Sequence, residues 1–223
     1  TQLSFIQKDF WQEDNFPAFR HAMTTLIEGC ASRGVPVVDI FHVNDTGGGP
    51  FSLENGFVAP MAFLTHQPAV TFYKHVHNAF TDTGLDHWLR VRDINHVIIC
   101  GMRTEQCCET TARVASDLGY QVTFVSEATL TFPMTHKGIT LDCDALRHRT
   151  ETVLDGREGV MPEWGTVLTG MGGPEAVDYT IAYVRTLSAP ETLQNNYMAA
   201  RGKKLYDKRD TAREKDWQRE KER

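Results

Sequence analysis

The chain has 223 residues, of which 41% are hydrophobic and 23% are charged, and these ordinary globular values exclude a wholly disordered, collagen-like or coiled-coil chain. No apolar run approaches the roughly 18 residues that a membrane-spanning helix needs, so no membrane contact is predicted. The net charge of −6 is uneven, because residues 199–223 carry ten Lys and Arg against six Asp and Glu. The acidic remainder is a poor candidate for nucleic-acid binding, whereas the basic C-terminal part is not.

The first half of the chain combines helical periodicity with β-branched runs. Apolar residues recur at helical spacing between Phe19 and Cys30, and Gly34 then stops the pattern. In chain order, we expect a helix over residues 16–33, a strand over 35–43, a glycine-rich loop over 46–50, a short strand over 69–73 and a helix over 85–91.

The second half of the chain alternates strands and helices. We expect a strand over residues 96–100, a turn over 101–106, a helix over 107–118, a strand over 121–125, a helix over 142–154 and a last strand over 164–168. Gly119 suits the left-handed position that ends a helix. This alternation predicts a three-layer α/β/α fold with a mostly parallel sheet.

The cysteines predict a reducing environment. Their number is odd, two of them are adjacent in sequence, and their spacing matches no zinc site. Free thiols are the rule in the cytoplasm, so we predict a cytoplasmic protein in which one thiol could be reactive. The five residues are Cys30, Cys100, Cys107, Cys108 and Cys143.

Cys107 follows a buried strand and a tight turn, and it opens a predicted helix. Ligands of open α/β sheets bind at the carboxyl ends of the strands. The positive end of the helix dipole favours the thiolate form of a cysteine placed there, and nearby backbone amides can hold an oxyanion. Cys107 is therefore a candidate nucleophile, although many free cysteines serve only as small buried hydrophobic residues.

The residues around this cysteine resemble a known family. Gly101-Met-Arg-Thr-Glu-Gln-Cys-Cys-Glu-Thr-Thr-Ala-Arg113 is similar to the nucleophile segment of the isochorismatase-like cysteine hydrolases, which include nicotinamidases and N-carbamoylsarcosine amidohydrolases. The resemblance covers roughly residues 1–168. It implies that Cys107 is the nucleophile, that the Met102–Arg103 peptide bond is cis, and that the backbone amides of Arg103 and Cys107 form the oxyanion hole.

The same family resemblance extends to residues 72–80, Phe-Tyr-Lys-His-Val-His-Asn-Ala-Phe. This segment is similar to the one that carries the catalytic lysine of the family, and the matching position is Lys74. An ammonium group beside the thiol would stabilise its thiolate form. A lysine at the end of a strand is more commonly an ordinary surface residue, and this alternative stays open.

The family opens with a strand that ends in Asp-x-Gln, and Thr1-Gln2 with Phe5 and Trp11 resembles the part after that aspartate. The resemblance therefore puts the catalytic aspartate and the first core strand before Thr1. A second register would use Asp9 instead, but it places Phe5 where an aspartate is required. The chain opens without a methionine, so we expect an incomplete or processed N-terminus.

The resemblance implies hydrolysis of a small amide or carbamoyl-type substrate through a thioester, without a cofactor. Gln2, Trp11 and His42 are predicted to contact the substrate, although Trp11 fits a core position equally well. Some nicotinamidases hold a metal through Asp and His residues. The nearby candidates Asp39, His42, His75 and His77 have no recognised ligand spacing, so no metal is predicted. The family also implies a homo-oligomer, and the substrate itself stays open.

The chain divides into a predicted hydrolase domain, residues 1–170, and an extension, residues 171–223, which we expect to be helical or disordered. Gly172-Gly-Pro174 predicts a linker. Residues 200–223 resemble the basic tail of the SsrA-binding protein, which acts with RNA in ribosome rescue, and this implies a contact with RNA or the ribosome. The alternative function is therefore an inactive isochorismatase-like scaffold that carries an RNA-binding tail.

Overall fold

The computed structural model describes residues 1–44, 46–155 and 166–168. The elements of the first half are the short helix η1 (Leu3–Phe5), α1 (Phe16–Ser32), β1 (Val38–His42), η2 (Leu53–Asn55), β2 (Val70–Lys74) and α2 (Leu85–Arg90). Those of the second half are β3 (His96–Met102), the π-helical turn η3 (Thr104–Cys108), α3 (Glu109–Asp117), β4 (Gln121–Leu130), β5 (Met134–His136), β6 (Ile139–Leu141), α4 (Cys143–Asp155) and β7 (Thr166–Leu168).

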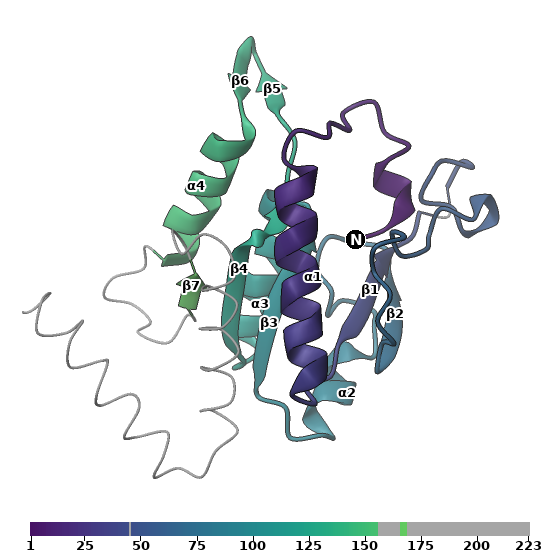
Figure 1. Ribbon diagram of the computed structural model, residues 1–223, viewed down its shortest axis with the longest axis vertical. Coiled ribbons are helices and arrows are strands. Elements are labelled where there is room, and N and C mark those ends of the chain that lie inside the picture. Colours follow the sequence, from purple (N-terminus) through teal and green to yellow (C-terminus); the bar gives the residue numbers. More distant parts are fainter. Residues whose placement is uncertain (45, 156–165, 169–223) are drawn as a thin grey trace, which may run out of the picture. The chain divides into compact units, whose positions relative to one another are not determined.

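The described strands form two parallel sheets and one antiparallel hairpin (Figure 1). One parallel sheet pairs β1 with β2, and the other has the order β3-β4-β7. The ladder between β1 and β2 ends with His42 opposite Lys74, so both residues stand at the carboxyl end of their strands. The expected α/β fold with mostly parallel strands is confirmed, and the strand expected ahead of Thr1 lies outside the sequence.

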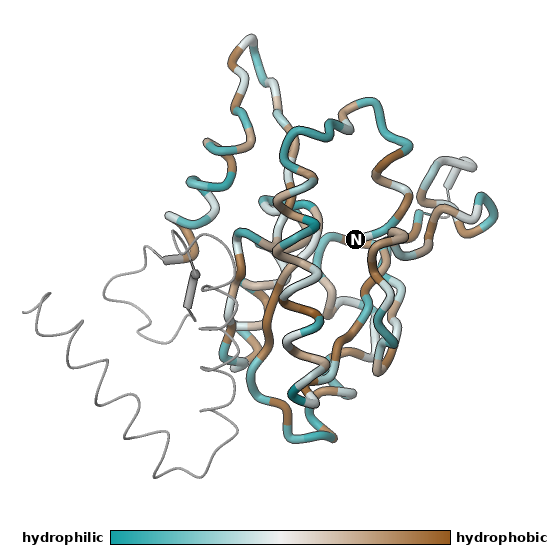
Figure 2. Tube along the Cα trace, in the orientation of Figure 1, coloured by the Kyte–Doolittle hydropathy of each residue, from teal (hydrophilic) through white to brown (hydrophobic). Residues whose placement is uncertain are grey.

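Helices cover both faces of the β3-β4 sheet. Phe19 and Met23 of α1 pack with Met102 and Leu130 at the ends of β3 and β4, together with Phe5 of η1. On the other face, residues of α2 and α3 pack against the same two strands; these are Leu85, Leu89, Ala112, Ala115, Ile99, Val122 and Phe124. Figure 1 shows α1 in front of the strands and α3 behind them, and Figure 2 shows hydrophobic residues following β3 through the interior.

The structure corrects the expected start of the helix at Cys107. An α-helical hydrogen-bonding pattern begins only at Glu109, and Thr104–Cys108 form a wider π-helical turn before it. Cys107 thus lies within the first turn of a continuous helical segment and not at its first residue. Such π-helical turns are frequent at functional sites. Gly119, with φ +88°, ends the helix as expected.

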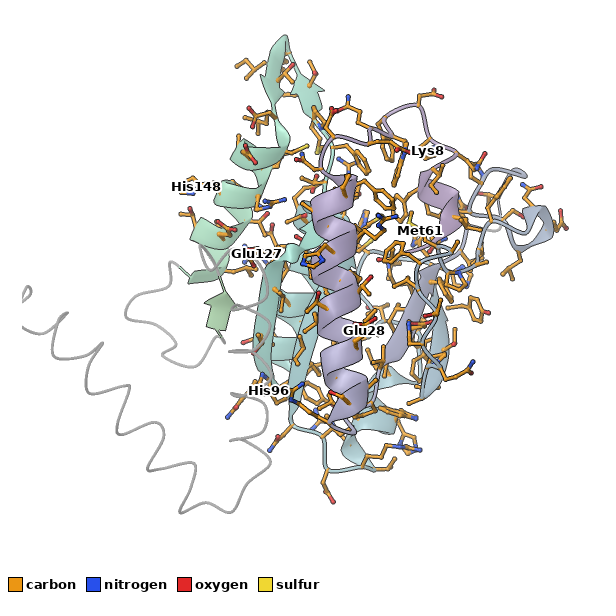
Figure 3. All side chains as sticks on the ribbon, in the orientation of Figure 1. Lys8, Glu28, Met61, His96, Glu127 and His148 are labelled. Carbon is orange, nitrogen blue, oxygen red and sulfur yellow. The ribbon has the colours of Figure 1, made fainter. Side chains whose placement is uncertain are left out.

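Two further features depart from the expectations. Strand β4 continues five residues beyond Val125 to Leu130, and the hairpin β5–β6 was not predicted at all. No helix among the described residues is long and apolar enough to cross a membrane. The predicted domain boundary after residue 170 and the predicted tail structure lie outside the described residues. Figure 3 labels His96 at the start of β3, and the site built below lies at the opposite end of this strand.

Candidate active site

Cys107 and Lys74 meet where the carboxyl ends of β2 and β3 approach one another. Lys74 is the last residue of β2, and Cys107 lies in the turn that follows β3. The Lys74 Nζ atom donates a hydrogen bond to Cys107 Sγ over 3.3 Å. The two predicted catalytic side chains are therefore in direct contact, although 33 positions separate them in sequence.

The Lys74 ammonium is held in a buried position. Only 4% of the residue is exposed, and Nζ also donates to the carbonyl oxygen of Val76 over 2.8 Å. The Nδ1 atom of His42 lies 3.5 Å from Nζ and offers a third acceptor. An ammonium group has three N–H donors. Its neighbours thus satisfy it in an orientation that keeps a positive charge beside the sulfur.

Two histidines complete the surroundings of Cys107 and Lys74. Burial, and next to it the Lys74 charge, lower the pKa of His42, so its imidazole is neutral at neutral pH. On the other side, His77 Nδ1 lies 3.9 Å from Cys107 Sγ, and the His77 side chain is exposed. Half-buried Cys107 therefore stands between a buried ammonium group and an exposed imidazole.

Gln2 holds the backbone of His42. Its Oε1 accepts from the His42 N–H over 2.7 Å, and its Nε2 donates to the His42 carbonyl over 3.0 Å and to Ser4 Oγ over 2.8 Å. Gln2 is only 2% exposed and both N–H groups of its amide are occupied, and its predicted substrate contact stays a prediction. The structure gives Gln2 a supporting role, in which it joins the first residues of the chain to the end of β1.

The turn between β3 and Cys107 has an unusual backbone. The Met102–Arg103 peptide bond is cis. The Arg103 carbonyl oxygen accepts from the backbone N–H groups of Gln106 and Cys108, and this closes the turn around Cys107. Gly101, with φ +128°, adopts a backbone conformation that other residues rarely adopt, immediately before the cis bond.

The Arg103 side chain points into an aromatic cluster. Its guanidinium lies 3.0 Å from a Glu105 carboxylate oxygen and 4.9 Å from the centre of the Phe10 ring. Trp11 packs in the same cluster, with ring centroids 5.2 Å from Phe16 and 5.4 Å from Phe132. The structure thus places Trp11 in the core under α1, and its predicted substrate contact stays a prediction.

The remaining thiols differ electrostatically from Cys107. Burial raises the pKa of Cys100 to about 12 and that of Cys108 well above its ordinary value. Burial also raises the pKa values of Cys30 and Cys143. At neutral pH these four thiols are protonated, and a protonated thiol is a poor nucleophile. Cys107 alone among the five thiols contacts the Lys74 ammonium in the described structure.

The four residues considered as metal ligands do not converge. Asp39 pairs with His66, with 2.9 Å between Oδ1 and Nε2, whereas His42 faces Lys74 and His77 faces Cys107. Within residues 1–44, 46–155 and 166–168, no group of three or more His, Cys, Asp or Glu side chains is arranged to hold a metal ion.

Comparison with known proteins agrees with this geometry. The family model for the isochorismatase domain matches residues 2–158. The chain belongs to the isochorismatase family. An isochorismatase family protein of Bacillus subtilis (strain 168), YrdC, is 27% identical over 169 residues, which span 74% of this chain and 88% of YrdC. Nicotinamidase 3 of Arabidopsis thaliana is 38% identical over 85 residues, or 33% of this chain and 43% of that protein.

Solved structures of the isochorismatase family share the fold. The crystal structure of a cysteine hydrolase from Pseudomonas syringae pv. phaseolicola 1448A superposes with a TM-score of 0.66 and 20% sequence identity, covering 80% of this chain and 89% of the other. The protein is thus a hydrolase of the isochorismatase family with a cysteine and a lysine at the carboxyl ends of parallel strands.

A separate segment of the chain is similar to another protein. The SsrA-binding protein of Bordetella pertussis is 51% identical over 53 residues, which are 24% of this chain and 34% of that protein. The chain thus spans about a third of this relative's length. The tail from which sequence analysis predicted an RNA contact, residues 200–223, lies outside the described residues.

Sequence reasoning missed two members of the site. His77 was considered only as a metal ligand, and its contact with Cys107 depends on the path of the loop after β2. Glu105 was not considered, yet its carboxylate lies beside the Arg103 guanidinium and accepts a hydrogen bond from Thr131. The short distance in sequence between Lys74, at the end of β2, and His77 was the available signal for His77. The sequence held no signal for the contact of Glu105 with Thr131, because the two residues are 26 positions apart.

Proposed function

We propose that this protein is a cysteine-dependent amidohydrolase that cleaves the C–N bond of a small amide or carbamoyl-type substrate. The observation that carries the proposal is the contact of 3.3 Å between Lys74 Nζ and Cys107 Sγ within an isochorismatase fold. A thiolate held beside a buried ammonium group is a strong nucleophile toward carbonyl carbon. Two relatives of the chain bear the name nicotinamidase, which supports amide chemistry.

In the proposed reaction, Cys107 Sγ attacks the carbonyl carbon of the amide and Lys74 stabilises the thiolate beforehand. The backbone amides of Arg103 and Cys107 hold the oxyanion that forms. Ammonia or an amine leaves, and water hydrolyses the resulting thioester. The turn closed by the Arg103 carbonyl is compatible with this role, because it holds Arg103 and Cys107 in one turn.

The proton acceptor in this proposal is the aspartate that the family resemblance implies immediately before Thr1. The surroundings of Thr1 are compatible with it. A Cβ atom built on Gly101 would lie 3.6 Å from Thr1 Oγ1 and 3.9 Å from Cys108 Sγ. Thr1 is therefore a neighbour of the turn that carries the nucleophile, and a residue joined to its nitrogen is within reach of that turn.

A screen of small primary amides and carbamoyl compounds for ammonia release tests the proposal. A chain that carries the proposed aspartate before Thr1 should release ammonia from at least one compound, and its Cys107→Ala variant should release none. Intact-protein mass spectrometry on rapidly quenched samples should detect the acyl group on the wild-type protein only. If Cys107→Ala releases ammonia at the wild-type rate, the thioester route is wrong.

The second candidate function is an inactive scaffold whose basic tail binds RNA, and the similarity to the SsrA-binding protein favours it. Binding of a structured RNA to the full chain should then weaken as salt concentration rises. Replacing Lys203, Lys204, Lys208 and Arg209 by Gln should weaken it further, with Cys107→Ala as the neutral control. Loss of RNA binding without loss of hydrolysis would leave the enzyme proposal as the better one.

A further inference from the structure

The Cys107 sulfur has a different nitrogen neighbour on each of its two sides. On the buried side, Lys74 Nζ lies at 3.3 Å and is shielded from solvent. On the exposed side, His77 Nδ1 lies at 3.9 Å. His77 comes from the loop that directly follows β2, and this loop is fixed to the site because the Val76 carbonyl accepts a hydrogen bond from Lys74 Nζ. The end of β2 and the loop that follows it thus supply the two neighbours of the sulfur.

Only one of these neighbours can accept a proton from water. An ammonium group has no free electron pair, so Lys74 cannot act as a base while it holds the thiolate. His42 contacts Lys74 Nζ at 3.5 Å on the buried side. His77 is exposed to water and its ring nitrogen is adjacent to the sulfur. Cys107 contacts His77 directly, and the charges of Lys74, His77 and His75 all act on His42.

We infer that His77 is a further catalytic residue, which acts as the general base for the water that hydrolyses the thioester on Cys107. The inference rests on the proposed function, since it requires an acyl group on that sulfur. It adds a residue whose contact is with the reacting atom itself. It also explains why an imidazole stands on the solvent side of the nucleophile, where water arrives after the amine has left.

The step balances with the residues present. Neutral His77 takes a proton from water as the water oxygen forms a bond to the thioester carbonyl carbon. The carbon–sulfur bond then breaks, and its electron pair stays on Cys107 as a thiolate next to the Lys74 ammonium. The carboxylic acid product departs, and the His77 imidazolium gives its proton to solvent. One water is consumed, and no oxidant or other reactant is needed.

p-Nitrophenyl acetate is a probe that isolates this step. The Cys107 thiolate displaces p-nitrophenolate, which absorbs light and needs no proton to leave, so acylation is seen as a burst. Hydrolysis of the acetyl thioester is then followed by intact-protein mass spectrometry as the loss of the acetyl group. Both half-reactions are therefore measured on the full chain without knowledge of its natural substrate.

His77→Ala should leave the burst unchanged and lengthen the lifetime of the acetyl-protein about 100-fold, the low end of what a general base contributes. Added imidazole should shorten that lifetime in His77→Ala much more than in the wild-type protein, because the vacated position is open to solvent. The dependence of the hydrolysis rate on pH should differ between the wild-type protein and His77→Ala, because only the wild-type protein has the proposed base.

His136→Ala is the matched control, because His136 is an exposed histidine in the hairpin β5–β6. It should match the wild-type burst, lifetime and pH profile. No burst with the wild-type protein would overturn the proposed function itself. A normal burst with an unchanged lifetime in His77→Ala would overturn only the role of His77. Loss of the burst in His77→Ala would also overturn it, since His77 would then act on formation of the thiolate and not on water.

Discussion

Lys74 Nζ donates to Cys107 Sγ at the point where two parallel strands of different sheets end. Within the described part of the chain, the other hydrogen-bond partners of Lys74 Nζ are the Val76 carbonyl and the His42 ring, and neither can carry a negative charge. The sulfur is therefore the natural site for the compensating negative charge. This relation makes the reactivity of one thiol depend on one buried ammonium group.

Replacing Lys74 by Met removes the charge and keeps most of the side-chain volume. Since a neighbouring cation favours the thiolate, which is the form that reacts, alkylation of Cys107 by iodoacetamide at pH 7 should slow about tenfold. The rate is measured by peptide mapping over time. Lys137→Met, in the turn of the exposed hairpin, is the control and should react as the wild type. An equal rate in Lys74→Met would refute the thiolate pairing.

Selectivity among the thiols provides a second test. At neutral pH, limiting iodoacetamide should modify Cys107 before any other cysteine, because burial raises the pKa values of Cys100 and Cys108. As the pH rises toward 9, modification of the other cysteines should increase relative to Cys107. Mass spectrometry of the digested protein identifies the modified residues. Early labelling of Cys100 or Cys108 in the folded protein would contradict this picture.

Replacing the buried Glu109 should strongly reduce the stability of the folded protein. Its carboxylate is buried at 5% exposure and accepts from Arg113 over 3.0 Å and from Thr150 Oγ1 over 3.1 Å, and it also pairs with Arg149 of α4. Glu109→Gln removes the negative charge and one of the two acceptor oxygens, so Arg113, Arg149 and Thr150 lose their charged acceptor. We expect a loss of about 3 kcal/mol in the free energy of unfolding, measured by urea titration. Glu28→Gln on the exposed side of α1 should change it by less than about 0.5 kcal/mol.

Replacing Gly101 by a residue with a side chain should strain the backbone. At φ +128°, an alanine is disfavoured, so Gly101→Ala should cost about 1–3 kcal/mol in unfolding free energy and should slow alkylation of Cys107, because the turn that follows would shift. Gly49→Ala is a suitable comparison, since Gly49 has no such φ and a Cβ atom there meets nothing within 4 Å. Identical stability of the two variants would argue against strain at Gly101.

His96 predicts how stability depends on pH. Burial lowers its pKa from 6.5 to about 4, so between these values the unfolded chain binds a proton that the folded protein does not. Stability is therefore fully present above pH 6.5 and is lost as the pH falls toward 4, with about 2 kcal/mol lost at pH 5. Urea titrations at pH 7 and 5 should show a smaller loss for His96→Gln. His136→Gln should retain the wild-type loss.

The sequence was sufficient to single out Cys107 and Lys74, which the structure brings into contact, and to predict the alternation of strands and helices around them. Cys107 and Lys74 each belong to a segment whose residue order resembles the family, and parallel strands bring their ends together. The helix start was misplaced, because a π-helical turn has no sequence signature distinct from an α-helical one. The hairpin was missed because Ile139 and Leu141 are apolar and yet exposed. Lys137 and Gly138 form the turn of this hairpin, and both have positive φ. The glycine was the signal in the sequence that was overlooked.

Gln2 has a supporting role that the pattern did not predict, and its substrate contact stays a prediction. Its place in the opening motif predicted a contact with substrate, but burial and three hydrogen bonds commit its amide to Ser4 and to the backbone of His42. Sequence cannot distinguish these roles, because both require an amide at the same position. The Glu109 cluster was equally unpredictable, since Arg149 and Thr150 approach it from a helix 40 residues later.

The pairing of His42 with Lys74 in the ladder between β1 and β2 has an evolutionary consequence. Side chains alternate between the faces of a strand, so an insertion or deletion of one residue inside β2 would turn the ammonium away from the thiol. The long connection between these strands is under no such constraint, because the ladder fixes their alignment whatever its length. Changes in the length of that connection are therefore compatible with an unchanged contact between Lys74 and Cys107.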